Sequence, residues 1–389
     1  MKLVFLSNYF NHHEKPLSDA LFAHPGIEYT FIQTEKMAEE RVRMGWGIDT
    51  KDIPYVRYFD DDPEGNRDLV MNADCVIFGG VDDESYIMPR LEARRLTLRY
   101  QERIYKEGQW KFISPRGLRK KYHDHTRFKN DPVYLLCAGA YVASDFSLIH
   151  AYPGKKYVWG YFPEFIEHDI DALISSKEEN ELLWTGRMID WKHPDAALKS
   201  ALYLKEKNKS FHLTMAGGGE LEDSLKQFVT DNGLDKFVTF TGFLKPAEIR
   251  TLMEKASVYI FTSDEKEGWG AVVNEAMNSG CAVVASHAAG AVPYLLRHKD
   301  NGLVYKSGRQ KELDFYLENL LEKNELRCRL GKNAYHTIAG KWNASYAANR
   351  LADWLSDRKE TSVEKIPSPM DMAECISPGK GYEFAHRDL

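Results

Sequence analysis

Short apolar runs alternate with longer helical stretches along the whole 389-residue chain. Most of the short runs are continuously apolar, as in strands that are buried on both faces. The alternation therefore predicts parallel sheets of the doubly wound α/β type. The expected strands are residues 2–7, 28–33, 75–80, 111–114, 133–138 and 156–162 in the first half, and 181–186, 211–217, 237–242, 257–263, 281–286 and 302–305 in the second.

A chain of this length accommodates two domains of ordinary size. The segment 161–181 is polar, contains Pro163 and precedes a fresh apolar strand, so we place an interdomain linker there. We expect an N-terminal domain over 1–163, a linker over 164–180, a C-terminal domain over 181–345, and a helix and tail over 346–389 that packs back on the N-terminal domain.

The composition, 43% hydrophobic and 28% charged residues, is that of a globular protein. No apolar run is long enough to span a membrane, and the first residues turn polar too early for a signal peptide. Five scattered cysteines without C-x-x-C spacing indicate reduced thiols rather than a disulfide or zinc framework. We therefore expect a cytoplasmic protein.

Positive charge is concentrated between Arg90 and Asn130. This segment holds thirteen Lys or Arg and four Asp or Glu, a net charge of +9 in a chain whose net charge is −6. Such a segment can contact anionic lipid headgroups, nucleic acid or phosphorylated substrates. It can equally be a solvated helix surface.

Three groups of candidate ligand-binding residues lie in loops that follow expected strands of the second half. In the first, Arg187 and Lys192 lie in a loop between a strand that ends at Gly186 and a helix that Pro194 opens. Two cations beside a helix N-terminus form a site for a diphosphate, although a pair of surface salt bridges would produce the same pattern.

The other two groups are rich in glycine. Gly217 and Gly218 belong to a three-glycine turn that lets a phosphate or a base approach the backbone, a weak signal by itself. In "DEKEGWGAVVNEAMNSG" the carboxylates of Glu267 and Glu275 stand eight residues apart across a glycine-containing loop that opens a helix. This pairing suits sugar and ribose hydroxyls at the acids and phosphates at the free amides.

The motifs "TGRMIDWK", "EGWGAVVNE" and "SHAAGAVPYLLRHKDNGLVY", in this order, resemble the retaining GT-B glycosyltransferases, specifically glycosyltransferase family 4. The resemblance covers about residues 180–345, and the first half is similar mainly in layout. It implies two facing Rossmann-like domains with an interdomain cleft, and a nucleotide-sugar donor held mostly by the C-terminal domain. His193 and Tyr294 depart from the glycine and the glutamate that are common in the family.

The resemblance also assigns roles in the second half. Arg187 and Lys192 would grip the donor diphosphate and stabilise its departing charge, and Glu267 would contact the transferred sugar, so these three form the expected catalytic set. Glu275 would bind the ribose. The remaining expected donor-binding residues are Gly186, Gly217 and Gly218 at the strand ends, Gly242 and Phe243 at the nucleobase, and Gly268, Trp269 and Gly270 in the loop before Glu275.

Acceptor-side candidates lie in the first half, in loops after expected strands: His12, His13 and Asp82. The Asp82–Asp83 pair is equally typical of a helix N-cap. Adjacent histidines diverge and no third ligand is evident, so we expect no metal site. The resemblance likewise implies no cofactor, since GT-B donors are generally held without a metal.

We therefore expect a retaining glycosyltransferase that moves a sugar from a UDP- or GDP-sugar to a glycan or lipid-diphosphate-linked acceptor in cell-surface polysaccharide biosynthesis. Residues 90–130 would hold it at the anionic inner face of the cell membrane, and nucleic acid is not an expected partner. The alternatives are a GT-B nucleotide-sugar epimerase, a phosphorylase, for which no pyridoxal-phosphate lysine stands out, and a non-catalytic nucleotide-sugar-binding protein.

Overall fold

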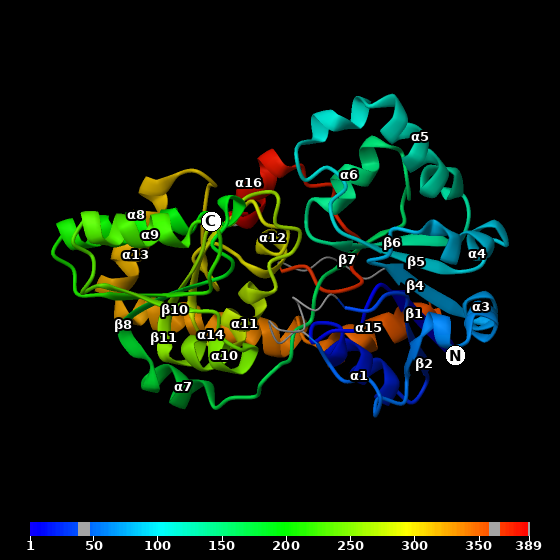
Figure 1. The fold of residues 1–389 in the computed structure, drawn as a ribbon, viewed down its shortest axis with the longest axis horizontal. Helices are drawn as coiled ribbons and strands as arrows, with labels where there is room; N and C mark the ends of the chain where they lie inside the picture. The colour runs from blue at the N-terminus through cyan, green and yellow to red at the C-terminus, as the bar shows by residue number, and fades with distance from the viewer. Residues whose placement is uncertain (38–46, 358–365, 388–389) are drawn as a thin grey trace. The chain divides into compact units, whose positions relative to one another are not determined.

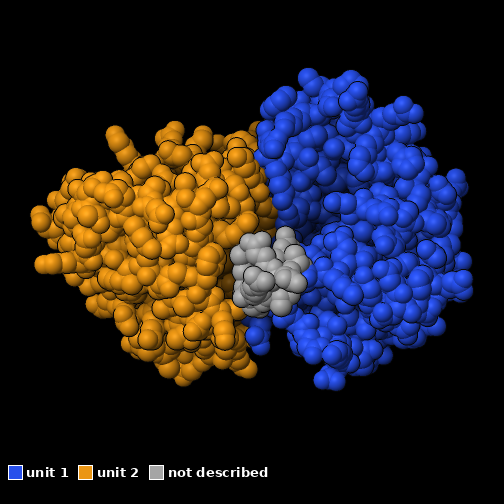
Figure 2. Space-filling view, in the orientation of Figure 1, with its two compact units in different colours: residues 1–164, 343–377 blue, residues 165–342, 378–389 orange. Residues whose placement is uncertain are grey.

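The computed structural model describes residues 1–37, 47–357 and 366–387, which form two compact units (Figure 1). Figure 2 colours unit 1, made of residues 1–164 and 343–377, and unit 2, made of residues 165–342 and 378–389. The segment 164–180, where the sequence places a linker, contains helix α7 (Ile170–Ser176) of unit 2. Residues 346–389, expected to pack on the N-terminal domain, divide between the two units at 377.

Unit 1 contains a seven-stranded parallel sheet. Its spatial order is β3-β2-β1-β4-β5-β6-β7, in which the chain starts near the centre, fills one side and then the other. All five residues of β4, in "CVIFG", are buried, as expected of a strand covered on both faces. The strands are β1 (Lys2–Ser7), β2 (Glu28–Gln33), β3 (Val56–Tyr58), β4 (Cys75–Gly79), β5 (Thr97–Gln101), β6 (Val133–Ala138) and β7 (Lys156–Trp159).

Helices cover this sheet, and a later segment protects its edge. Residues 370–373 run antiparallel to β7, with Val158 N donating to Asp371 O at 2.8 Å and Met370 N to Val158 O at 2.9 Å. This pairing satisfies part of an edge that would otherwise present unpaired backbone groups. The helices of unit 1 are α1 (Lys15–Ala23), α3 (Pro63–Asn72), α4 (Met88–Glu92), α5 (Pro115–Asp124), α6 (Val142–Leu148) and α15 (Ala344–Asp357), and α15 packs on α1.

Unit 2 repeats the plan with six parallel strands in the order β10-β9-β8-β11-β12-β13. Buried side chains such as Leu213, Val258 and Val284 form its core between the sheet and the helices. The strands are β8 (Glu178–Thr185), β9 (His212–Ala216), β10 (Val238–Gly242), β11 (Ala256–Phe261), β12 (Ala282–Ser286) and β13 (Leu303–Tyr305). The other helices are α8 (Pro194–Glu206), α9 (Glu222–Asp231), α10 (Pro246–Lys255), α11 (Val272–Asn278), α12 (Val292–Leu295), α13 (Gln310–Glu322), α14 (Asn324–Lys341) and α16 (Gly381–Ala385).

The predicted doubly wound α/β architecture is confirmed, but one strand of the first half was predicted in the wrong place. Residues 111–114 do not form a strand, since residues 109–113 form the 3-10 helix η3 (Gln109–Ile113). The strand that fills this place in the sheet is β5, whose sequence "TLRYQ" carries Arg99 at a buried position. A charged residue interrupts the apolar pattern in β5, which was therefore missed. The three-residue strand β3, with the sequence "VRY", was not predicted either.

Candidate functional site

The centre of the sheet in unit 2 is where a ligand site is expected. The chain enters the sheet at β8, continues through β9 and β10 on one side, and then crosses to β11 on the other. The loops after β8 and β11 therefore diverge at a topological switch point, the place where open α/β sheets bind ligands. Both loops carry residues that the sequence singled out.

An ion pair joins these two loops. Lys192, in the 3-10 turn η5 (Asp190–Lys192) after β8, donates from Nζ to the Glu267 carboxylate in the loop after β11. The two side chains are only 14% and 13% exposed, so the pair is largely screened from water. Ser263 Oγ also donates to the Glu267 carboxylate, at 3.1 Å. The structure thus brings together two of the three predicted catalytic residues, which are 75 positions apart in the sequence.

Backbone contacts fix the two loops against each other. Thr262 Oγ1 donates to Lys192 O at 2.6 Å, and Asp264 N donates to Trp191 O at 3.0 Å. His193 adopts a left-handed conformation at φ 46° just before α8. Its Nε2 lies 3.2 Å from the Asp264 carboxylate, and this hydrogen bond raises the pKa of the histidine. His193 therefore has a hydrogen-bond partner across the site.

Arg187 is the third predicted catalytic residue. It lies in the same loop as Lys192, is exposed, and places its guanidinium 5.7 Å from the centre of the Trp191 ring. The Lys192 ammonium lies 5.0 Å from the same ring. Both cations therefore lie near the same Trp191 ring. Such a pair suits a ligand with two adjacent negative groups.

Glu275 lies in the first turn of α11. Burial raises the pKa of its carboxyl, and the charge of Arg250 partly opposes this effect. Arg250, on α10, donates to the Glu275 backbone carbonyl at 3.0 Å and to the Asn278 side chain at 3.0 Å, which ties α10 to α11. Glu275 thus belongs to the helix that follows the Glu267 loop, as predicted.

Gly217 and Gly218, two of the predicted donor-binding glycines, lie where other atoms pack closely against the backbone. A Cβ added to Gly217 would lie 1.9 Å from the Gly186 carbonyl oxygen, so only glycine allows the loops after β8 and β9 to touch. Gly218 lies against Phe243, because an added Cβ would be 2.8 Å from its ring. The Phe243 ring, which follows Gly242 at the end of β10, is 60% exposed. An exposed ring against a bare backbone offers a flat apolar surface.

Within the predicted loop 268–270, the side chain of Trp269 points into the core. It is 1% exposed, its Nε1 donates to Asn274 at 2.9 Å, and its ring centre lies 5.5 Å from that of Trp342. Gly270 is close to Phe261, since an added Cβ would be 2.8 Å from that ring, and it has φ 96°. In this loop the backbone, rather than the indole, is the group available to a ligand.

In unit 1, the acceptor-side candidates lie at the carboxyl ends of two adjacent strands, β1 and β4. The His12 and His13 ring centres are 3.9 Å apart, and burial followed by the charge of His12 lowers the pKa of His13 to about 3. Asp82 is exposed, and its neighbour Asp83 accepts a hydrogen bond from Ser85 N at 2.8 Å. Asp83 therefore caps η2 (Glu84–Tyr86), the second of the two roles considered for this pair.

Glu14 lies in the same loop as His12 and His13, and no role was predicted for it from the sequence. This residue precedes α1 and is 9% exposed, and burial raises the pKa of its carboxyl to about 7. Burial and, to a smaller extent, the charge of Glu14 raise the pKa of three tyrosines from other parts of unit 1, namely Tyr29, Tyr100 and Tyr161. No local pattern could have identified it, because those neighbours are distant in the sequence.

Metal-binding clusters and membrane-spanning helices are both absent from the described ranges 1–37, 47–357 and 366–387. Within them, no group of three or more His, Cys, Asp or Glu side chains is arranged to hold a metal ion. Nor is any helix of this part of the chain long and apolar enough to cross a membrane.

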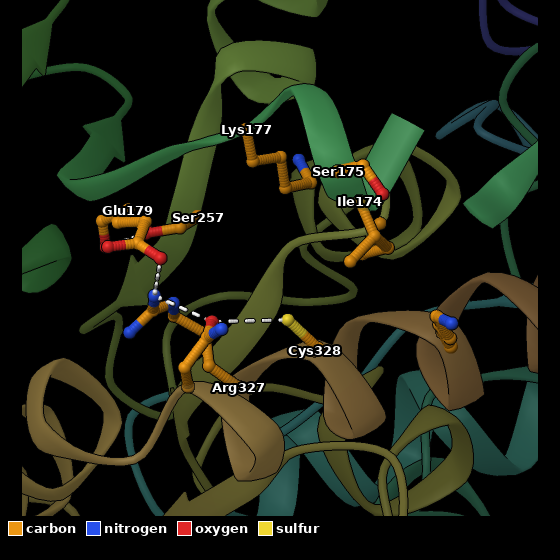
Figure 3. Close-up of a pocket in the computed structure, with 10 residues that line it drawn as sticks. Ile174, Ser175, Lys177, Glu179, Ser257, Arg327 and Cys328 are labelled. Carbon is orange, nitrogen blue, oxygen red and sulfur yellow. Dashed lines mark hydrogen bonds and ion pairs between the residues drawn. The ribbon is translucent and has the colours of Figure 1, made fainter. Parts of the chain in front are cut away.

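A pocket of about 280 Å³ lies at the opposite edge of the unit 2 sheet, where β8 and β11 begin (Figure 3). Its cations already have partners. Lys177 Nζ donates to the carbonyls of Met253, Glu254 and Ala256 at 2.8–3.1 Å. Arg327 faces Glu179 and donates to Leu320 O at 2.6 Å. These bonds attach α10 and α14 to the starts of the strands, a structural role, and none of the predicted site residues lines the pocket.

Comparison with known proteins finds a family match in unit 2. Residues 165–337 match the family model described as "Glycosyl transferases group 1". The match includes both loops of the switch point and every predicted donor-side residue, and it lies entirely within unit 2.

Curated relatives match over the same part of the chain. An alpha-D-kanosaminyltransferase of Streptomyces kanamyceticus is 28% identical over 171 residues, 44% of each chain. The amylovoran biosynthesis glycosyltransferase AmsK of Erwinia amylovora is 28% identical over 179 residues, 45% of this chain and 44% of AmsK. The matched region thus spans less than half the length of these relatives.

A solved structure matches over almost the whole chain. HepE of Anabaena, solved in complex with UDP, aligns with a TM-score of 0.69 and 17% identity over 92% of this chain and 100% of its own. The two Rossmann-like units therefore have the GT-B fold of glycosyltransferases. This confirms the fold predicted from the motifs.

Proposed function

We propose that the chain is a retaining glycosyltransferase of family 4 that transfers a sugar from a UDP- or GDP-sugar to a glycan or lipid-linked acceptor. The observation that carries the proposal is the Lys192–Glu267 ion pair at the switch point of unit 2. It sets a cation for a phosphate beside a carboxylate for sugar hydroxyls. The family match, the named relatives and the likeness to a UDP complex support this direction.

The chemistry follows from where charge develops. As the bond between sugar and nucleoside diphosphate breaks, negative charge grows on the phosphate oxygens, and Arg187 and Lys192 stabilise it. Glu267 holds the hydroxyls of a sugar that gains oxocarbenium character. The acceptor hydroxyl oxygen bonds to the anomeric carbon from the face that the diphosphate leaves, and its proton passes to the departing phosphate. Glu275 binds the ribose, and the exposed ring of Phe243, which packs against the Gly218 backbone, provides an apolar surface for the nucleobase. No metal or cofactor is required in this scheme.

The setting of the reaction is also a proposal. AmsK is named for amylovoran biosynthesis, and we infer a comparable place in cell-surface polysaccharide assembly for this chain. We expect it to act in the cytoplasm at the inner face of the cell membrane, with a glycan or lipid-diphosphate-linked acceptor on the side of His12, His13 and Asp82.

A thermal-shift series tests the donor assignment. UDP, UDP-sugars, GDP and GDP-sugars are added in turn, because a ligand that binds only the folded state raises the melting temperature. In Glu267→Gln, the nucleoside diphosphate should still raise it, whereas the extra rise from the matching sugar should be lost. Full transfer activity in Glu267→Ala would contradict the catalytic assignment. Conversion of the donor sugar without any acceptor would instead identify an epimerase, and binding without turnover a non-catalytic protein.

A further inference from the structure

The basic segment 90–130 does not form one charged surface. The side chains of Arg90, Arg99 and Arg103 are buried, the last two against Glu84 and Asp145. The exposed Lys and Arg side chains of the segment lie mainly in residues 109–124, which include η3 and α5. We call these residues the η3–α5 surface.

Large apolar side chains are concentrated on this surface. Of the eight exposed large hydrophobic residues in the described chain, four lie within thirteen positions. They are Trp110 at 67% exposure, Ile113 at 65%, Leu118 at 37% and Tyr122 at 60%. Scattered single apolar residues are normal on protein surfaces, whereas a cluster of this kind marks an interaction site.

Helix α5 departs from the pattern of an ordinary surface helix. Such a helix buries its apolar side and exposes its charges. In α5, Asp124 is buried, whereas Leu118 and Tyr122, which are four residues apart and thus on one side of the helix, are exposed. The core of unit 1 therefore does not account for these apolar residues.

Cations surround the exposed apolar side chains. No acid occurs between Gly108 and His123, and the same stretch holds five Lys or Arg. Arg116 and Arg119 are exposed, and within the described ranges no ion pair involves either of them. Lys111 and Lys120 pair with Glu107 and Asp124. Exposed Trp, Tyr, Leu and Ile among cations is the composition of a helix that lies in the interface of an anionic membrane.

We propose that the η3–α5 surface binds an anionic lipid bilayer by inserting its apolar side chains among the headgroups. The surface follows the carboxyl end of β5, and the loop with His12 and His13 follows the carboxyl end of β1, so both leave the same edge of the parallel sheet of unit 1. This step rests on the proposed function: a lipid-linked acceptor of the proposed transfer would reach that edge from the bound membrane. Binding itself does not depend on the transfer.

Co-sedimentation of the full chain with vesicles tests the surface. Vesicles of phosphatidylcholine with phosphatidylglycerol should sediment the wild type, and vesicles of phosphatidylcholine alone should bind it more weakly. A serine variant that combines Trp110→Ser, Ile113→Ser, Leu118→Ser and Tyr122→Ser should bind at least about tenfold more weakly. Its control is Phe315→Ser, which changes an exposed apolar residue of unit 2. Arg116→Glu with Arg119→Glu should also weaken binding, in contrast to Lys236→Glu with Lys311→Glu, at exposed positions of unit 2.

Added salt tests how the surface binds vesicles, and added UDP distinguishes a failure of the membrane proposal from a failure of the proposed function. Added salt should weaken binding without abolishing it, because inserted apolar groups are not screened. Wild-type protein that stays in the supernatant, or a serine variant that sediments like the wild type, would overturn the proposal. The proposal would also be overturned if the wild type formed a dimer, the serine variant were a monomer, and neither protein bound vesicles. UDP should raise the melting temperature of wild type and serine variant equally; if it raises neither while vesicles bind, the proposed function fails and the membrane surface stands.

Discussion

Lys192 and Glu267 form an ion pair between the two loops that diverge at the centre of the unit 2 sheet. Each side chain is largely buried, and each has a further contact in the site: Lys192 with Trp191, and Glu267 with Ser263. A buried charge that loses its partner is costly. The pair therefore holds both groups in position for a ligand that carries a phosphate next to hydroxyls.

Lys192→Ala should lower the rate of glycosyl transfer by about 10²- to 10³-fold, the usual effect of removing a group that stabilises transition-state charge. It should also reduce the rise in melting temperature that UDP produces. Lys199→Ala is the matched control, because Lys199 lies on α8 in an exposed ion pair with Asp195. Equal transfer rates for the two variants would remove Lys192 from the catalytic set.

The stability of unit 1 should depend on pH through Glu14. Burial raises the pKa of this carboxyl to about 7 in the folded protein, so between its usual value and about 7 the folded state keeps a proton that the unfolded state has released. The free energy of unfolding should therefore fall as pH rises across this window, by up to about 3 kcal/mol, and level off beyond it. Glu14→Gln should lack this fall.

Urea denaturation of wild type and Glu14→Gln at a series of pH values measures the difference. Glu28→Gln, at an exposed position, is the control and should follow the wild type. A constant difference between wild type and Glu14→Gln from acid to alkaline pH would show that the carboxyl does not titrate in this window.

Glu84→Ala should destabilise unit 1 by about 3–5 kcal/mol, because it leaves a buried guanidinium without its carboxylate. Arg99 is 0% exposed and donates to the two Glu84 oxygens at 2.6 and 2.5 Å. Glu92→Ala removes an exposed acid that faces Arg127 and should cost less than about 1 kcal/mol. The double variant Glu84→Ala/Arg99→Met should recover part of the loss. Equal urea midpoints for Glu84→Ala and Glu92→Ala would contradict the role of the pair.

The Glu84–Arg99 pair also shows which part of the fold could not be predicted from the sequence. Continuous apolar strands such as β4 and β12 were recognised because burial on both faces leaves a local pattern. β5 was missed because Arg99 breaks that pattern, and its burial depends on a glutamate in another loop. The charge of segment 90–130 could be counted from the sequence, but which cations turn inward is decided by tertiary contacts.

Site residues were predictable to the extent that their spacing is local. Glu267 and Glu275 flank one loop, and Arg187 and Lys192 share another, so each pair was visible in the sequence. That the two loops meet follows from strand order, which the apolar pattern does not specify. Glu14 had no local signal, since its neighbouring tyrosines come from β2, β5 and the segment after β7.

Asp371→Ala should detach the segment after α15 from the sheet of unit 1. The Asp371 carboxylate is 3% exposed and accepts hydrogen bonds from Arg350 and from Ser368 N, both at 2.8 Å, while its backbone pairs with β7. Removing it leaves a half-buried guanidinium and an unpaired amide, which should lower the free energy of unfolding by about 2–4 kcal/mol. Limited proteolysis should then cleave within residues 366–377 faster than in the wild type or in Lys380→Ala, an exposed control. Unchanged cleavage would mean that the β7 pairing holds the segment without the carboxylate.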